Sequence, residues 1–581
     1  MKKKHYSNEE IIDVLRETLA AMEVKEVNRF RIRAYQNAID AIENLTSSVY
    51  DLWEKGTLST VNGIGATLSQ HLNELFTTGS VKDFTNIKKD LPDGMFGLLV
   101  LRGVGAKTAY KLANAFDINK RENALDTVKK AAQANKIQLL PGFGEKSEKD
   151  ILNAIEEAKE HKSVRQRLLL PHAEEISQRV ITHLKKSDAI VKIDVLGSQR
   201  RREDTVGDLD LAVITTNPEE AILHFLEFPE IKEVDSKGEK KASVILTNGV
   251  QVDLRVSTEA AYGAMLQYFT GNKQHNVLLR SLALEQKKSL SEYGIKINGN
   301  IKEFPDEESF YTELGLPYIP PELRQGDEEI EFAQKNKLPN LVNLSDIKGD
   351  LHTHTTYSDG TAQLPEMVEK AIALGYKYIG ITDHAPSVQS RGRYDVLGII
   401  EARKREIEQI NSSQSSIRVL FGYEINILKD ASISLPEDIV AQLDYAIGAI
   451  HTSMDQSKDE ITKRLVAALE HPHINIIAHP SGRLLNQRNS YEVDWDVVLD
   501  AAKANKKILE IDAQPSRRDL AYDLVKRARK MDIKLSIDTD AHSVLDMELM
   551  PYGIDVARRG WCEAKDIINT YDLDSFLKLL G

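Results

Sequence analysis

The chain has 581 residues, more than one domain usually holds, and a formal net charge of −13. Its single cysteine, Cys562, excludes a disulfide-stabilised fold and favours a reducing compartment. No apolar stretch approaches the ~20 residues of a membrane span, and the N-terminus, MKKKHYSNEE, lacks the apolar core of a signal peptide. We therefore expect a cytoplasmic, multidomain protein without membrane contact. The acidic average argues against nucleic-acid binding, although acidic linkers and metal-binding carboxylates can hide local basic surfaces.

A short glycine pattern occurs three times in the first 160 residues, which are typical of helices. Each copy has an apolar residue, then G-x-G, then the start of a helix. The glycine pairs are Gly63 and Gly65, Gly103 and Gly105, and Gly142 and Gly144. Such loops let backbone N–H groups approach an anion at a helix N-terminus, where the dipole also favours negative charge. One copy alone fits a tight interhelical turn, but three predict contact with DNA backbone, helped in the second copy by Arg102, Lys107 and Lys111.

Residues 191–256 contain three aspartates in a strand pattern. In VKIDVLGSQRRREDTVGDLDLAVI, a strand and a Gly-Ser turn precede a strand on which Asp208 and Asp210 share one face. In the hairpin SVILTNGVQVDLRV, alternation places Asp253 on the polar face of the second strand. Three carboxylates on adjacent strands suit two Mg²⁺ ions and nucleotidyl transfer. An Asp-x-Asp pair alone is more typical of a solvated turn, so the prediction depends on the Gly-Ser turn and Asp253.

The next segment, YFTGNKQHNVLLR, resembles the substrate-binding segment of family X DNA polymerases, typified by DNA polymerase beta. The spacings from the Gly-Ser turn to the aspartates, and from Asp253 to Tyr268, match that family over about residues 1–317. The resemblance identifies the glycine loops as helix-hairpin-helix motifs and the aspartates as catalytic metal ligands. It implies nucleotide binding by Gly197, Ser198, Arg201, Tyr268, Phe269, Gly271, Asn276 and Arg280.

The resemblance also implies a role for individual nucleotide-binding residues. Ser198 and Arg201 would bind the triphosphate, and arginine offers a bidentate fork for it. Tyr268 would lie near the sugar 2′ position, with Phe269 beside it. Asn276 would contact the base edge, and Arg280 the template strand.

Two positions depart from the family pattern. His71 stands where animal members carry a lysine that attacks an abasic sugar, and imidazole cannot form that Schiff base. We therefore expect weak or absent deoxyribose-phosphate lyase activity of this kind. Arg202 replaces a small residue that usually follows the arginine pair.

The last 230 residues alternate apolar runs with helical stretches, and most runs end at a metal-type side chain. Those side chains are His352, His354, Asp359, His384, Glu424, His451, His479, Asp540 and His542. Buried parallel strands with a ligand at each end describe an α/β barrel whose site lies at the strand C-terminal face. Imidazole and carboxylate are ligands for Zn, Mn or Fe, and clustered ions suit phosphoester hydrolysis. A single histidine here would more often be structural, but the whole series indicates a site.

This region, about residues 347–575, resembles the PHP (polymerase and histidinol phosphatase) family of metal-dependent phosphoesterases. The resemblance implies a distorted seven-stranded barrel with up to three divalent ions. The first would take His352, His354, Glu424 and Asp540; the second Glu424, His451 and His479; the third Asp359, His384 and His542. All nine positions are filled, which favours an active site. Arg483, in HPSGR, is a candidate phosphate contact and equally fits a surface arginine.

Together these patterns predict a multidomain α and α/β protein. The expected parts are an N-terminal helical domain (1–85), further helix-hairpin-helix structure (86–165), a mixed α/β palm (166–256), a nucleotide- and template-binding subdomain (257–317), a linker (318–346) and a C-terminal (β/α)₇ barrel (347–581). The resemblance implies a monomeric repair polymerase that fills short gaps, as in base excision repair. Gapped or primer-template DNA and deoxynucleoside triphosphates would be its substrates, with two Mg²⁺ or Mn²⁺ ions in the palm.

In the same scheme the barrel would use Mn²⁺, Zn²⁺ or Fe²⁺ as a 3′→5′ exonuclease, with abasic-site endonuclease or 3′-phosphoesterase activity as open additions. The alternative is a histidinol-phosphatase-like barrel to which the polymerase region adds only DNA binding.

Overall fold

The computed structural model describes residues 6–580, except 7, 45–48, 55, 57, 59–60, 62, 102, 164–166 and 414. Arg102 of the second glycine loop is thus outside the described residues. The chain divides into two compact units, Met1–Leu168 with Thr247–Val250, and Leu169–Leu246 with Gln251–Gly581. Among the helices of the described part, none is long and apolar enough to cross a membrane.

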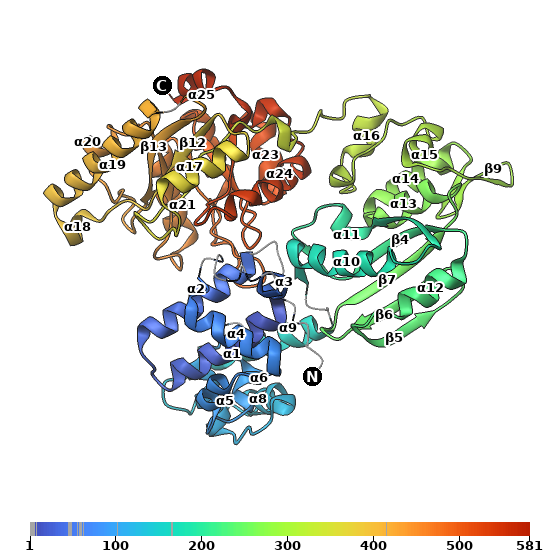
Figure 1. Cartoon of the computed structure of the whole chain (residues 1–581), viewed down its shortest axis with the longest axis horizontal. Helices are drawn as coiled ribbons and strands as arrows, with labels where there is room; N and C mark the ends of the chain where they lie inside the picture. Colours follow the sequence, from blue (N-terminus) through green and yellow to red (C-terminus); the bar gives the residue numbers. More distant parts are fainter. Residues whose placement is uncertain are drawn as a thin grey trace. The chain divides into compact units, whose positions relative to one another are not determined.

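The first unit is helical, as predicted (Figure 1). Its helices are α1 (Asn8–Val24), α2 (Arg29–Asn44), α3 (Val49–Glu54), α4 (Ala66–Thr78), α5 (Lys82–Lys88), α6 (Gly94–Leu98), α7 (Ala106–Ala115), η2 (Arg121–Asn123), α8 (Ala124–Gln133) and α9 (Glu145–Ser163). Two apolar clusters form its core. One includes Leu72 and Phe76, and the other includes Leu112 and Ile155.

The second unit begins with a five-stranded mixed sheet in the order β2-β4-β7-β6-β5. Its strands are β2 (Ile190–Val195), β4 (Leu209–Thr215), β5 (Ile231–Lys237), β6 (Lys241–Leu246) and β7 (Gln251–Ser257). The central strands β4 and β7 are parallel, and the other pairs are antiparallel. Helices α10 (Leu170–Leu184) and α12 (Pro218–Leu226) lie against this sheet. Short elements α11 (Gly197–Arg200) and β3 (Thr205–Val206) join β2 to β4.

A helical subdomain with a small sheet follows. Its elements are α13 (Tyr262–Thr270), α14 (Lys273–Glu285), β8 (Ser289–Ser291), β9 (Gly294–Ile297), β10 (Asn300–Lys302) and α15 (Glu307–Glu313). The segment that follows contains η3 (Pro321–Leu323), α16 (Glu329–Gln334) and η4 (Leu344–Asp346). Ile319, Leu323 and Ile330 of this segment share an apolar cluster with Phe310, so the segment packs onto the subdomain.

Seven parallel strands form the C-terminal barrel, in chain order. They are β11 (Gly349–Asp350), β12 (Tyr378–Ile381), β13 (Arg418–Asn426), β14 (Tyr445–Ala449), β15 (Ile476–Ile477), β16 (Ile508–Asp512) and β17 (Leu535–Asp538). A parallel bridge between Thr353 and Ala541 joins the first and last strands just beyond their ends. The predicted seven-stranded barrel is thereby confirmed.

Helices surround these strands (Figure 1). They are α17 (Leu364–Ala373), α18 (Val388–Arg391), α19 (Arg393–Ser413), α20 (Glu437–Val440), α21 (Lys458–Glu470), α22 (Trp495–Ala504), α23 (Tyr522–Lys530), η5 (Asp546–Leu549), α24 (Met550–Arg559), η6 (Ala564–Asp566), η7 (Ile568–Thr570) and α25 (Leu573–Leu580). Most residues of these strands are buried and apolar, as in parallel strands covered on both faces, although Glu510 and Ser536 lie within strands. Polar groups are therefore concentrated where the strands end.

Candidate active sites

The nine predicted ligands meet at one end of the barrel. Glu424 lies within β13, Asp359 lies in the loop nine residues after β11, and the other seven follow β11, β12, β14, β15 and β17 by two to four residues. The C-terminal ends of parallel strands lie at one end of a barrel. Residues as far apart in the sequence as His352 and Asp540 therefore lie close together.

The first group is fully buried around Glu424 and Asp540. The Nε2 atoms of His352 and His354 lie 3.6 and 3.7 Å from Oε2 of Glu424. The same atoms lie 3.4 and 3.0 Å from Oδ1 of Asp540. This is the set that the PHP resemblance implied for the first ion.

The second group uses the other oxygen of Glu424. Nε2 of His451 and Nε2 of His479 each lie 3.0 Å from its Oε1. Nδ1 of His384 lies 2.8 Å from its Oε2, so Glu424 contacts imidazoles from both the second and the third predicted sets. One carboxylate can therefore bridge neighbouring ions.

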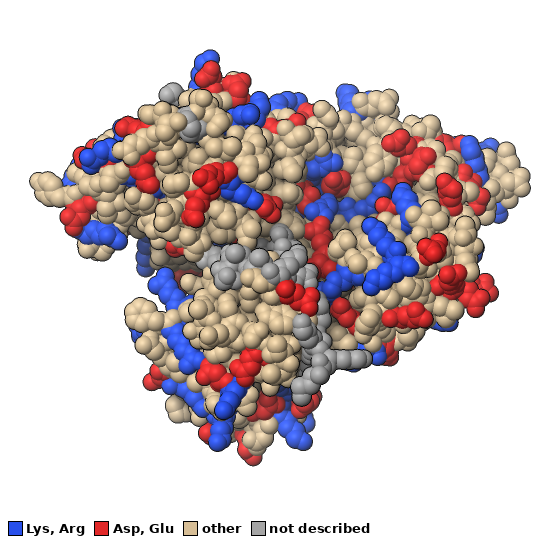
Figure 2. Space-filling view, in the orientation of Figure 1, with Lys and Arg blue, Asp and Glu red and all other residues tan. Residues whose placement is uncertain are grey.

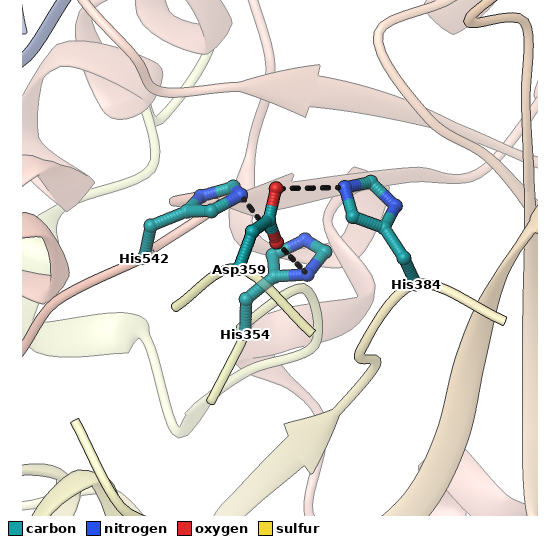
Figure 3. A group of neighbouring side chains, drawn as sticks. All are labelled: His354, Asp359, His384 and His542. Carbon is teal, nitrogen blue, oxygen red and sulfur yellow. Dashed lines mark ion pairs between the residues drawn. The ribbon is translucent and has the colours of Figure 1, made fainter. Parts of the chain in front are cut away.

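The third group is the outermost. His354, His384 and His542 converge on the carboxylate of Asp359 (Figure 3), at 3.9, 3.4 and 3.4 Å. The Asp359 side chain is 53% exposed, whereas that of His354 is fully buried. The cluster thus runs from a buried floor to an exposed rim.

The chemistry of this cluster fits divalent cations. Nε2 of His352, Nε2 of His354 and Oε2 of Glu424 are buried and have no hydrogen-bond partner. Burial alone would lower the pKa of His352, but the carboxylates of Glu510, Asp540 and Glu424 outweigh it and raise that pKa well above its usual value. Buried ligand atoms that face one another without hydrogen-bond partners are costly unless a cation or a proton lies between them.

Two further carboxylates support the ligands and were missed by the sequence prediction. Glu510 on β16 forms a hydrogen bond with Nδ1 of His352 at 2.6 Å. It also accepts a hydrogen bond from the His479 backbone N–H at 2.6 Å. Asp383 accepts from the Thr355 N–H at 2.6 Å and from the Arg403 guanidinium at 2.7 Å, and so fixes the loop that carries Asp359. The signal for Glu510 was its place in KILEID, an acidic residue inside an apolar run.

A second cluster of carboxylates lies on the palm sheet. Asp210 and Asp253 are register partners on β4 and β7, and Asp208 directly precedes β4. Nη2 of Arg255 lies 3.9 Å from Asp210 and 3.5 Å from Asp253. Burial and the charge of Asp208 raise the pKa of Asp210 to about 7, and Arg255 only partly opposes this. Carboxylates crowded in this way fit a site for divalent cations.

The predicted triphosphate-binding turn lies beside these aspartates. Gly197 has φ +59°, and a Cβ on it would lie 2.8 Å from Oδ2 of Asp210, so only glycine fits there. Ser198 follows it and is half-buried. The guanidinium of Arg201 is mostly buried and donates to the Thr270 carbonyl, which joins the turn to the segment carrying Gly271.

The remaining predicted nucleotide contacts are gathered on α13 and α14. Tyr268 and Phe269 pack edge to face with ring centroids 4.9 Å apart. The Asn276 amide donates to the Tyr268 carbonyl at 2.7 Å, and Nε of the exposed Arg280 donates to the Asn276 carbonyl at 3.1 Å. The Arg255 guanidinium lies 3.8 Å from the Phe269 ring centre, which connects this group to the aspartates.

The three glycine loops of the first unit share one geometry. Gly63, Gly103 and Gly142 have φ of +81°, +78° and +87°. Gly65 and Gly105 are the extended N-caps of α4 and α7, and α9 begins directly after Gly144. Backbone N–H groups at these helix starts are suited to an anion.

The charged side chains around these loops are dispersed. Lys107 forms an exposed ion pair with Glu26 at 2.8 Å. Such exposed pairs contribute little to stability, so the lysine can exchange this partner for a phosphate. On the face shown in Figure 2, Lys and Arg are interspersed with Asp and Glu. Contact with DNA through the loops would therefore depend on backbone N–H groups more than on a broad basic surface.

Arg483 has partners within the protein. Its guanidinium donates to the carbonyls of Arg517 and Arg518, and to Asp204 of the palm at 2.9 Å. To contact a phosphate it would have to exchange Asp204 for it, so the phosphate-binding role stays a prediction.

Known protein families match four stretches of the chain. They are described as a helix-hairpin-helix domain (residues 6–81), a SAM-like helix-hairpin-helix tandem (97–157), a DNA polymerase beta thumb (265–325) and a PHP domain (350–514). The protein described as DNA polymerase/3′-5′ exonuclease PolX of Bacillus subtilis (strain 168) is 36% identical over 576 residues, which covers 97% of this chain and 99% of that protein. The chain belongs to the PolX family. This confirms the family predicted from the motifs.

Shorter relatives match about two fifths of the chain. A probable phosphatase of Caldicellulosiruptor bescii is 30% identical over 250 residues, 40% of this chain and 95% of that protein. A probable phosphatase of Thermoanaerobacter sp. (strain X514) is 26% identical over 232 residues, 38% of this chain and 89% of that protein. Both relatives are described as probable phosphatases, and each matches less than half of this chain.

Proposed function

We propose that this PolX family member is a DNA-directed DNA polymerase that fills short gaps during repair, and that its barrel is a 3′→5′ exonuclease. The observation that carries the proposal is the presence of two separate carboxylate-rich sites in one chain that aligns with PolX along almost its full length. The helix-hairpin-helix loops supply a means of holding DNA backbone, which a small-molecule phosphatase does not need.

In the palm, Asp208, Asp210 and Asp253 would hold two Mg²⁺ or Mn²⁺ ions beside the Gly197–Ser198 turn. Bound ions would activate a primer 3′-hydroxyl and neutralise charge on the triphosphate. Ser198 and Arg201 would bind the triphosphate, and Tyr268, Phe269 and Asn276 would border the sugar and base. Because Gly197 has no Cβ, the backbone of this turn can approach the Asp210 carboxylate closely.

In the barrel, the nine ligands would hold up to three Mn²⁺, Zn²⁺ or Fe²⁺ ions. The ions would lower the pKa of a water and polarise a phosphodiester. A strand end would approach from the exposed rim at Asp359, with the buried His352 and Glu424 at the floor of the site. A DNA 3′-end that leaves the palm would be the substrate, and the protein would act as a monomer on gapped or primer-template DNA.

The palm assignment is tested by single-nucleotide incorporation on gapped DNA. Asp208→Ala should abolish incorporation while leaving degradation of a 3′-end unchanged. Incorporation by Asp208→Ala at the wild-type rate would refute the assignment.

The barrel assignment is tested by His451→Ala on a 3′-mismatched primer in Mn²⁺. Degradation should be lost, while gap filling is retained. Unchanged degradation by the variant would contradict the assignment of the barrel as the exonuclease. Hydrolysis of histidinol phosphate by the wild type provides the comparison with a small-molecule phosphatase. That alternative is not favoured, because the probable phosphatases named above match 40% of the chain or less.

A further inference from the structure

The palm turn that follows the triphosphate-binding residues has an unusual backbone. Arg202 has φ +57°, a left-handed conformation that costs a non-glycine residue about 1–2 kcal/mol. It is also the position at which the family pattern has a small residue. A strained conformation persists only where the surroundings hold it in place. The contacts around Arg202 therefore show what holds this turn.

Barrel arginines hold the backbone of the turn. Arg559 donates to the carbonyl of Arg201 at 3.0 Å. Arg518 donates to the carbonyls of Arg202 and Glu203, each at 3.1 Å. Arg518 and Arg559 are 0% and 1% exposed, so water does not compete for these contacts.

The side chains of the turn are paired with the barrel as well. The Arg202 guanidinium lies 2.7 Å from the Asp555 carboxylate of α24. Asp204 lies 2.9 Å from Arg483 and 3.3 Å from Arg518. These pairs join residues about 280–350 positions apart in sequence. The side chains of Arg202, Asp555, Arg483 and Asp204 are 11–25% exposed, so these pairs are mostly shielded from water and attach the turn to the barrel.

On its other side, the same turn is continuous with the polymerase site. The Glu203 N–H donates to the Ser198 carbonyl at 3.0 Å, and the Arg201 N–H to the Gly197 carbonyl at 3.2 Å. Gly197 in turn lies against Asp210. A displacement of the turn would therefore be passed directly to the triphosphate-binding residues, and a 1 Å misplacement can cost about 10²-fold in rate.

We propose that Arg518 and Asp555 of the barrel are positioning residues of the polymerase site. By holding the turn of residues 201–204, they place Ser198 and Arg201 for the incoming nucleotide. This inference rests on the proposed polymerase function. It gives the barrel a second role besides hydrolysis, and it accounts for an arginine at position 202, whose side chain reaches Asp555.

The test uses the full-length protein and two independent variants. Arg518→Met with Asp204→Asn removes both charges of the Arg518–Asp204 pair, while Arg483 keeps the carbonyls of Arg517 and Arg518 as partners. Asp555→Asn removes the partner of Arg202 from the barrel side. Arg558→Met is the matched control, because Arg558 lies on the same helix and contacts Glu322 instead of the turn.

The readouts are KM for the deoxynucleoside triphosphate and kcat in single-nucleotide gap filling, together with 3′-end degradation and thermal melting. Both test variants should raise KM roughly five- to tenfold with kcat within about twofold, because the aspartates are untouched and only nucleotide placement is altered. Degradation by both test variants, and all readouts of the control, should match the wild type, whereas the test variants should melt at a somewhat lower temperature because each loses buried partners. This pattern separates positioning from folding.

Unchanged KM in both variants, beside an active wild type, would overturn the inference and leave the proposed function standing. Parallel loss of incorporation, degradation and melting temperature would also overturn it, since the contacts would then serve folding alone. A wild type that incorporates no nucleotide would instead refute the polymerase function, and the inference with it.

Discussion

Nδ1 of His352 and Oε1 of Glu510 lie 2.6 Å apart, and both side chains are fully buried. The other oxygen of Glu510 accepts the backbone N–H of His479. One carboxylate thus orients two ligands that belong to different predicted ion sites. Carboxylates behind metal-binding histidines set the ring orientation and raise ligand basicity.

Glu510→Gln should therefore weaken metal retention in the barrel by about 10–100-fold. Metal content after dialysis against graded chelator measures this directly, without reference to activity. Degradation of a 3′-end should fall in parallel, and gap filling should not. Glu548→Gln, which changes a barrel carboxylate paired with Lys370, is the control. Equal metal retention in the Glu510 variant and the wild type would contradict the role of Glu510.

Protons and metal ions are expected to compete for the Asp210 carboxylate in the palm. Burial, then the charge of Asp208, raise the pKa of Asp210 to about 7 from an ordinary value of 3.8. Below that pKa a proton occupies the carboxylate, so the Mg²⁺ concentration for half-maximal incorporation should rise by up to about tenfold per pH unit. Measuring it at pH 6 and pH 8 tests this, and identical values would count against it.

The same shift has a consequence for stability without metal. A raised folded-state pKa contributes stability that is fully present below the unfolded pKa, near 3.8, and is lost as pH rises through about 7. As pH rises from about 3.8 to about 7, the free energy of unfolding of the metal-free palm should therefore lose this contribution. Mg²⁺ should restore it above pH 7, where the carboxylate is charged. Arg255→Met should move the upper limit to higher pH, because Arg255 lowers the pKa of Asp210.

The sequence was sufficient to predict which side chains gather at the end of the barrel, but not which contacts they share. Most predicted barrel ligands lie at or just beyond the end of an apolar run, Asp359 lies farther along a loop, and the barrel brings them together. That His384 contacts Glu424 as well as Asp359 could not be inferred, because spacing along the chain does not fix imidazole orientation. The same limit applies to the pair of Arg483 and Asp204, since no local pattern relates residues 279 positions apart.

Gly197 is expected to be indispensable for incorporation. Alanine there would have φ +59° and a Cβ 2.8 Å from the Asp210 carboxylate, closer than real Cβ contacts allow. The turn or the aspartate must shift, and a shift near 1 Å predicts a loss of about 10²-fold in kcat/KM for gap filling. Gly398→Ala is the control, because a Cβ there meets nothing within 4 Å. Wild-type kinetics in Gly197→Ala would show that the close approach is unimportant.

His71 occupies the position of the family's lyase lysine, and its surroundings suit a neutral ring. Its Nδ1 lies 2.9 Å from the Tyr35 hydroxyl, its ring packs against Phe84 with centroids 5.1 Å apart, and burial lowers its pKa. Imidazole has no primary amine to condense with an aldehyde, so borohydride should trap no adduct at this residue on a 5′-deoxyribose-phosphate end.

Introducing the amine should change that result. His71→Lys would place an ammonium beside Asp83, whose carboxylate lies 3.7 Å from the present Nε2. Desolvation by Phe84 and Tyr35 would favour the neutral, nucleophilic amine, although Asp83 opposes this. Trapping by His71→Lys should therefore exceed that of the wild type, with the adduct at residue 71 by peptide mapping. Strong trapping by the wild type, mapped to a lysine elsewhere in the first unit and lost when that lysine is changed, would mean that this chain has lyase activity by another nucleophile.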